Sequence, residues 1–157
     1  MENNSPVVDS DTVKVDKYEP HKIANDKNEV TFFVASDEVD LADLQRYRIQ
    51  AQTECLIAIT TTNKDYDCLK LADNVILCSL NEVPLVMQAF QRLHSGSGII
   101  GMDWDEVKWA ISGNKNIEFL HGVAGGENCV TFACEQLIPK LKNLSSNYPI
   151  TNMMINI

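Results

Sequence analysis

The chain has 157 residues, of which 45% are hydrophobic and 22% are charged, a composition typical of one globular domain. It carries 13 basic and 22 acidic residues for a net charge of −9, with no basic run, so binding to nucleic acid or to an anionic membrane is not expected. All seven glycines fall between Gly96 and Gly126, which excludes a glycine-rich phosphate loop from the residues before Gly96.

The cysteines and histidines also restrict the class of protein. The five cysteines form no C-x-x-C pair and their number is odd, which favours a reduced, cytoplasmic setting. The three histidines lie far apart, so no metal site is expected. The first residues lack the cationic region and apolar run of a signal peptide, and no apolar stretch approaches the roughly 20 residues that a membrane span needs.

The first half of the chain alternates apolar runs with helical patterns. Residues 1–28 are polar and are expected to form a flexible leader, although Val7–Val8 and Val13–Val15 allow a short edge strand. A helix that Asp37 caps is expected to follow the first apolar run. Three apolar runs are expected to be buried strands: 30–35, 55–60 and 74–78. Strands at about 25-residue spacing indicate an α/β fold with a mostly parallel sheet and helices on both faces.

The second half keeps this alternation. Asn81 is expected to cap a helix that ends near His94, and a short helix is expected from Asp103 to Ile111. A strand is expected over 117–123 and another at the final apolar run, 153–157. The helix between them is expected to start near Glu127 and to be kinked or ended by Pro139.

Two segments of the second half carry a family resemblance. Residues 98–108 read GIIGMDWDEVK, and residues 122–128 read GVAGGEN and lead into a helix. In this order and at this spacing they resemble the FtsZ/tubulin-like family of cell-division GTPases, whose sequences read like GLINVDFADV and GVASGEDRA. The resemblance implies that residues 29–157 form a reduced FtsZ-like α/β domain, with part of the nucleotide-domain core, a connecting helix and the start of a second domain.

The resemblance also implies a site that two protomers share. In the family, one protomer holds the phosphates and the next supplies acids from an N-x-D-x-x-D loop. Asp103 and Glu106 match the two acids, with Glu in place of the second Asp and Gly101 in place of the Asn. With Met102 and Trp104 they form the expected interaction surface. Without the resemblance, the same two acids are an ordinary acidic helix start.

The phosphate-binding half of that site differs from the family. Where the family carries GGGTGTG, residues 36–40 of this chain read SDEVD. Phosphates favour the exposed amides and positive end of a helix amino-terminus, so three carboxylates there should repel a triphosphate. Intrinsic GTP binding is therefore not expected, and GTP would be held only by a partner.

These observations lead to one main expectation and two alternatives. The main expectation is a cytoplasmic, FtsZ-like protein without cofactor or intrinsic GTPase activity, acting by contact with an FtsZ-type protein or with itself in cell division. The first alternative is a partner-dependent GTPase in which Asp103 and Glu106 act in trans. The second is an accessory domain that binds a small ligand near Thr61 and Asn81, beside the carboxyl ends of the expected strands.

Overall fold

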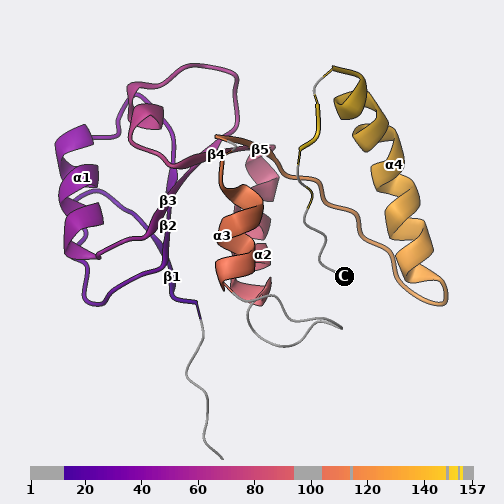
Figure 1. Cartoon of the computed structure of the whole chain (residues 1–157), viewed down its shortest axis with the longest axis horizontal. Coiled ribbons are helices and arrows are strands. Elements are labelled where there is room, and N and C mark those ends of the chain that lie inside the picture. The colour runs from indigo at the N-terminus through magenta and orange to yellow at the C-terminus, as the bar shows by residue number, and fades with distance from the viewer. Residues whose placement is uncertain (1–12, 94–103, 114, 148, 152, 154–157) are drawn as a thin grey trace, which may run out of the picture.

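A computed structural model describes residues 13–93, 104–113, 115–147, 149–151 and 153 of the chain. The strands are β1 (Val15–Lys17), β2 (Val30–Val34), β3 (Cys55–Thr60), β4 (Asn74–Leu77) and β5 (Asn116–Glu118). The helices are α1 (Leu41–Gln50), α2 (Val83–Leu93), α3 (Trp104–Ile111) and α4 (Cys129–Asn147), with 3-10 turns at Asp67–Lys70 and Leu80–Glu82. Figure 1 shows their arrangement.

The five strands form one sheet in the order β1-β2-β3-β4-β5, and every neighbouring pair is parallel. The pairing of β2 with β3 is the longest and runs in register from Val30 opposite Cys55 to Val34 opposite Ile59. All six residues of β3 are buried, because helices or loops cover both faces of a parallel sheet. The predicted α/β fold with a parallel sheet is confirmed.

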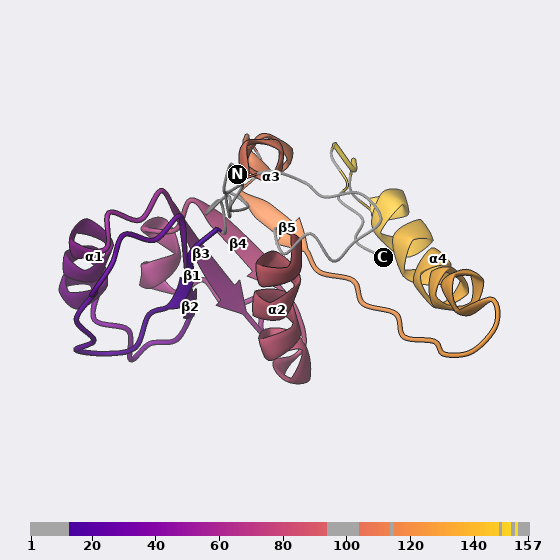
Figure 2. The same ribbon diagram turned by 90° about the horizontal axis from the view of Figure 1, so that it is seen from below.

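One face of the sheet is covered by α1 and by the segment that follows β3 (Figures 1 and 2). Leu44 and Tyr47, which lie three residues apart on α1 and therefore on one side of it, are both 0% exposed. They share a buried cluster with Phe33 and Leu56 of the sheet. The residues of β2 and β3 that contact α1 are therefore alternate residues of each strand, because successive side chains of a strand point to opposite faces.

The opposite face is covered by α2 and α3. Phe32 and Ile57, the strand neighbours of the residues that face α1, share a second buried cluster with Val86 and Phe90 of α2 and Val107 of α3. The rings of Phe32 and Phe90 meet edge to face, with 5.1 Å between their centroids. Figure 2 shows α1 and α2 on opposite sides of the strands.

The helix caps differ from the prediction by a few residues. Asp40, not Asp37, caps α1: its backbone is extended, at φ −72° and ψ 114°, and it directly precedes the first helical residue. Before α2 the cap is Ser79, which forms a reciprocal capping box with Glu82. Asn81, the predicted cap, lies inside the 3-10 turn. A sequence holding several candidate caps does not show which of them adopts the extended backbone.

Part of the expected leader belongs to the sheet. β1 lies within it and pairs with β2, so an edge strand does form, but at residues 15–17 rather than at Val13–Val15, and Val7–Val8 lies outside the described residues. Val13 and Val15 pack against the cluster beneath α2, and Tyr18 is only 5% exposed. The side chains of this polar segment therefore pack against residues that lie far away in the sequence.

The last described elements differ most from the prediction. The expected strand over 117–123 is limited to β5, and of the expected strand 153–157 only Met153 is described. Of the two predicted effects of Pro139, a kink or an end of the helix, the end is wrong, because α4 continues to Asn147. Proline removes the hydrogen bond to the carbonyl four residues earlier, which is that of Glu135, and Glu135 is exposed, so water can satisfy this carbonyl.

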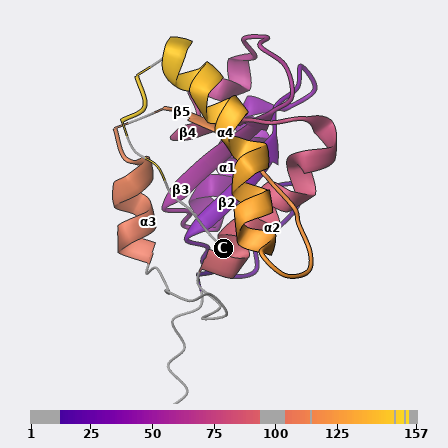
Figure 3. The same ribbon diagram turned by 90° about the vertical axis from the view of Figure 1, so that its right-hand side faces the viewer.

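α4 contains no buried residue. In Figures 1 and 2 this helix lies apart from the sheet and beside the segment 119–124, and in the view of Figure 3 it stands in front of the strands. The Gln136 amide joins the helix to this segment: its Nε2 donates to the carbonyl of Val123 at 2.8 Å, and its Oε1 accepts from the Val123 amide at 3.2 Å. Gly122 lies against the helix so closely that an added Cβ would stand 2.8 Å from the Ala133 carbonyl oxygen. Helix and segment thus form one small unit.

Candidate functional site

The start of α1, where the resemblance implies a phosphate loop, is occupied by a carboxylate of the chain itself. Oδ1 of Asp40 accepts from the amide of Ala42 at 2.8 Å and from the amide of Asp43 at 3.1 Å. These amides are among the groups that a helix amino-terminus offers to an anion. Asp40 satisfies them from within the chain.

The neighbouring acid Asp37 forms an ion pair with Lys64, which follows β3. The Lys64 ammonium lies 5.0 Å from the centre of the Tyr66 ring, and the hydrogen bond that it donates to Asp37 raises the pKa of this lysine. Both partners are largely exposed, so the pair contributes little to stability. It does link the carboxyl ends of β2 and β3 across the edge where a ligand would sit in an open α/β fold.

The polar groups after β3 and β4 serve local turns. The hydroxyl of Thr60 donates to the carbonyl of Thr62 at 2.8 Å, and Ser79 is engaged in its capping box with Glu82. The segment after β3 packs on the face of α1, whereas the one after β4 packs on the opposite face. Thr61 and Asn81, the residues of the small-ligand alternative, follow these two strands and are exposed. Both residues therefore lie at the carboxyl edge of the sheet, where the segment after β3 turns to one face and the segment after β4 turns to the other.

The opposite, amino-terminal edge of the sheet carries a charged cluster around Trp104. Its indole N–H donates to Oε2 of Glu54 at 3.2 Å. Glu54 also receives the ammonium groups of Lys27 at 3.1 Å and Lys108 at 3.5 Å. Hydrogen bonds, from Lys27 first and then from Trp104, lower the pKa of the Glu54 carboxyl. Glu54 therefore stays ionised and fixes the start of α3 next to the start of β3.

Of the predicted site residues, Trp104 and Glu106 lie in the first turn of α3, and Gly101, Met102 and Asp103 lie outside the described residues. Trp104 is partly buried and faces the sheet, whereas Glu106 is exposed. The first turn of α3 and the acidic segment 36–40 lie at opposite ends of the strands. At about 3.3 Å per residue, β3 alone separates these ends by roughly 17 Å.

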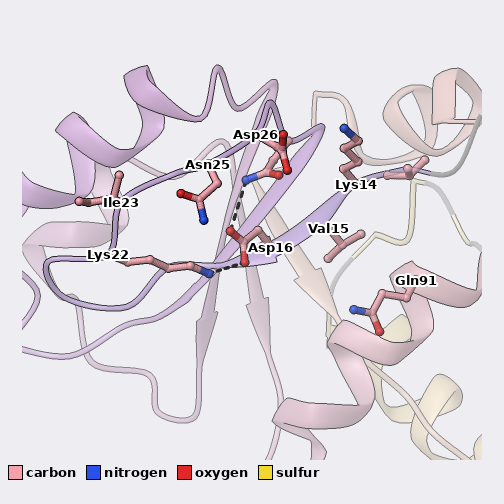
Figure 4. A pocket seen from close by; sticks show the side chains of 10 residues that line it. Lys14, Val15, Asp16, Lys22, Ile23, Asn25, Asp26 and Gln91 are labelled. Carbon is pink, nitrogen blue, oxygen red and sulfur yellow. Dashed lines mark hydrogen bonds and ion pairs between the residues drawn. The ribbon is translucent and has the colours of Figure 1, made fainter.

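A pocket of about 480 Å³ lies at the outer edge of β1, and its lining includes Asp16, Lys22 and Gln91 (Figure 4). Asp16 at its wall forms an ion pair with Lys22 at 2.5 Å, and Oδ1 of Asp16 also accepts from the Lys17 amide at 2.7 Å. Lys22 in turn donates to the Lys17 carbonyl at 2.9 Å. The backbone N–H and the carbonyl of Lys17 are therefore both hydrogen-bonded to side chains, which protects this end of the edge strand from pairing with another chain.

Sequence reasoning missed Asp16, Lys22 and Glu54. The spacing of these residues forms no recognisable motif, because their contacts with one another, with Trp104 and with Lys108 form only when β1 and α3 pack against the rest of the sheet. The one available signal was the alternation of Val13 and Val15 with polar residues, which is typical of a half-buried strand.

Within the described residues, no group of three or more His, Cys, Asp or Glu side chains is arranged to hold a metal ion. In the same part of the chain, every helix is too short or too polar to cross a membrane. Comparisons of the chain with protein-family models, with curated proteins and with solved structures find no match.

Proposed function

We propose that this protein is a cytoplasmic, FtsZ-like protein that does not bind nucleotide by itself and acts by contact with FtsZ-type filaments in cell division. The proposal starts from the resemblance of residues 98–108 and 122–128 to that family. The observation that carries it is the cap of α1, because the Asp40 carboxylate already occupies the amides of Ala42 and Asp43.

The two ends of the sheet support a one-sided role. An incoming triphosphate at the carboxyl edge would have to displace Asp40 and would meet Asp37 and Glu38 nearby, which disfavours its binding. The amino edge keeps an exposed Glu106 on a helix that Glu54 and Trp104 hold in place. A subunit that has only one of two complementary ends can add to a filament end and then block further growth.

Co-sedimentation with an assembling FtsZ-type protein tests this function. We expect the chain to sediment with the polymer and to lower the polymer amount at substoichiometric ratios. Charge reversal at the amino edge, Glu106→Lys, should abolish this effect, whereas Lys64→Glu at the carboxyl edge is the matched control and should retain it. No sedimentation and no change in polymer amount would contradict the proposal.

Direct GTP binding, measured with a fluorescent GTP analogue, tests the second half of the proposal. We expect no saturable binding to the purified chain, and an affinity in the micromolar range would overturn the proposal.

One observation supports the alternative of a partner-dependent GTPase: Glu106 is exposed in the first turn of α3. This alternative requires that Asp103→Ala or Glu106→Ala lowers the GTP turnover of the partner, and unchanged turnover would exclude it.

A further inference from the structure

The two tryptophans of α3 lie five residues apart and differ in their surroundings. Trp104 packs beside the buried cluster of the second sheet face and donates its N–H to Glu54. Trp109 is 73% exposed. Val107 and Ile111 are buried and mark the inner side of the helix, so the indole of Trp109 lies on the outer side. An indole this exposed buries little apolar surface within the chain.

Two carboxylates share that outer side. Asp105 precedes Trp109 by four residues and Glu106 precedes it by three, the spacings that place side chains next to one another on a helix. Both residues are exposed, and the Asp105 side chain is 87% exposed. Asp105 pairs with Lys108 at 2.7 Å, but a pair this exposed is weak in water.

The Lys108 ammonium lies between the two sides of α3: besides its 2.7 Å contact with Oδ1 of Asp105, it has two contacts toward the sheet. The Lys108 ammonium is 5.8 Å from the centre of the Trp104 ring and 3.5 Å from Oε2 of Glu54. Both of these contacts are with residues on the inner side of α3 or at the start of β3. The outer face, Asp105, Glu106 and Trp109, thus combines an open indole with acidic groups, on a chain whose net charge is −9.

We propose that this outer face of α3 is a docking surface for a basic, arginine-bearing segment of a protein partner. An arginine guanidinium stacks on an indole and binds carboxylates through its planar fork, so one side chain can satisfy both kinds of group. Tryptophan and arginine are also the residues that most often dominate binding energy at interfaces. The inference rests on the proposed function and adds the contact residue and the charge of the partner surface.

The co-sedimentation assay tests whether Trp109 contributes to binding of the filament. Trp109→Ala should weaken binding to the filament at least ten-fold, and raising the salt concentration should weaken wild-type binding, because charges contribute to it. Leu80→Ala is the matched control: Leu80 is 76% exposed but precedes α2 at the carboxyl edge, so this variant should bind like wild type. Equal binding by wild type and Trp109→Ala would overturn the inference. Thermal unfolding of both variants should match wild type, since neither side chain is buried.

A second measurement does not depend on the filament. A short peptide of alternating arginine and alanine is titrated calorimetrically into the wild-type chain, into Trp109→Ala and into the double variant Asp105→Asn/Glu106→Gln. We expect saturable binding to wild type and at least five-fold weaker binding to both variants. A matching glutamate peptide should not bind. Equal arginine-peptide affinities for the three proteins, or no binding to wild type, would contradict the docking surface.

The two assays separate the failure of the inference from that of the function. Filament binding that survives Trp109→Ala would leave the proposed function standing and refute this surface. Arginine-peptide binding that depends on Trp109, without any filament binding, would support the surface and refute an FtsZ-type partner.

Discussion

Asp43 on α1 joins three parts of the chain through one carboxylate. Its Oδ2 accepts from the Tyr18 hydroxyl at 2.7 Å and from the His21 amide at 2.8 Å, and its Oδ1 accepts from the Arg46 guanidinium. Its side chain is only 10% exposed. These hydrogen bonds, from Arg46 first, hold the pKa of the Asp43 carboxyl well below its ordinary value. The residue therefore fastens the loop after β1 to α1 in its ionised form.

The stability of the fold should accordingly fall in acid. A carboxyl whose pKa is lower in the folded than in the unfolded chain stabilises the fold above its unfolded pKa, about 3.9. That contribution is lost as the pH falls below about 4 toward the folded-state pKa. We expect the urea midpoint to decline from pH 5 to pH 3 in wild type and less steeply in Asp43→Asn. An identical pH dependence in the two proteins would contradict this role of Asp43.

At the scale of elements, α4 depends on a few close contacts with the extended segment before it. Gly122 allows the approach, since a Cβ there would stand 2.8 Å from the Ala133 carbonyl oxygen and 3.3 Å from Cγ of Leu137. Backbone cannot move aside as a flexible side chain can. The Gln136 amide adds two hydrogen bonds to Val123. Helix and segment are thus held together by contacts that an added methyl group would disturb.

Gly122→Ala should therefore loosen α4. Overpacking of this kind costs about 1–3 kcal/mol, and we expect faster amide hydrogen exchange over residues 129–147, with little change in β2 and β3. Gly125→Ala is the matched control, because nothing lies within 4 Å of the Cβ it would add and Gly125 shows no positive φ. Unchanged exchange in Gly122→Ala, or equal effects of both substitutions, would refute the close contact.

At the scale of the whole molecule, stability depends on two apolar clusters on either side of one sheet. Successive residues of β3 alternate between them: Leu56 and Ala58 belong to the cluster beneath α1, and Ile57 and Ile59 to the cluster beneath α2 and α3. Each of the four is 0% exposed. β3 therefore couples both layers, so its loss would unfold them together.

Truncation of β3 should destabilise the whole molecule. Leu56→Ala removes buried methyl groups and leaves a cavity, which typically costs about 2–5 kcal/mol. We expect a lower midpoint of urea unfolding with the same shift for probes of α1 and α2. Leu80→Ala, at a position that is 76% exposed, should change the free energy of unfolding by less than about 0.5 kcal/mol. A shift confined to α1 would show that the layers unfold separately.

Several features of the fold could be predicted because they depend on neighbouring residues. The apolar runs of β2, β3 and β4 and the helical periodicity of α2 and α3 are local patterns, and the parallel sheet follows from their alternation. Which acid caps α1 could not be predicted in this way, since Asp37 and Asp40 are equally suitable side chains. The choice depends on where β2 ends and how its loop reaches α1.

The sequence alone determined that three carboxylates stand at residues 37–40, where the resemblance implies a phosphate loop, and that the chain carries a net charge of −9. Only the tertiary structure decided that Asp40 occupies the amides of α1, that Glu54 meets Trp104, and that Trp109 lies outside while Trp104 faces the sheet. The physical reason is distance along the chain. Composition and periodicity act through adjacent residues, whereas the pair Glu54–Trp104 spans fifty positions and exists only once β3 and α3 have packed together.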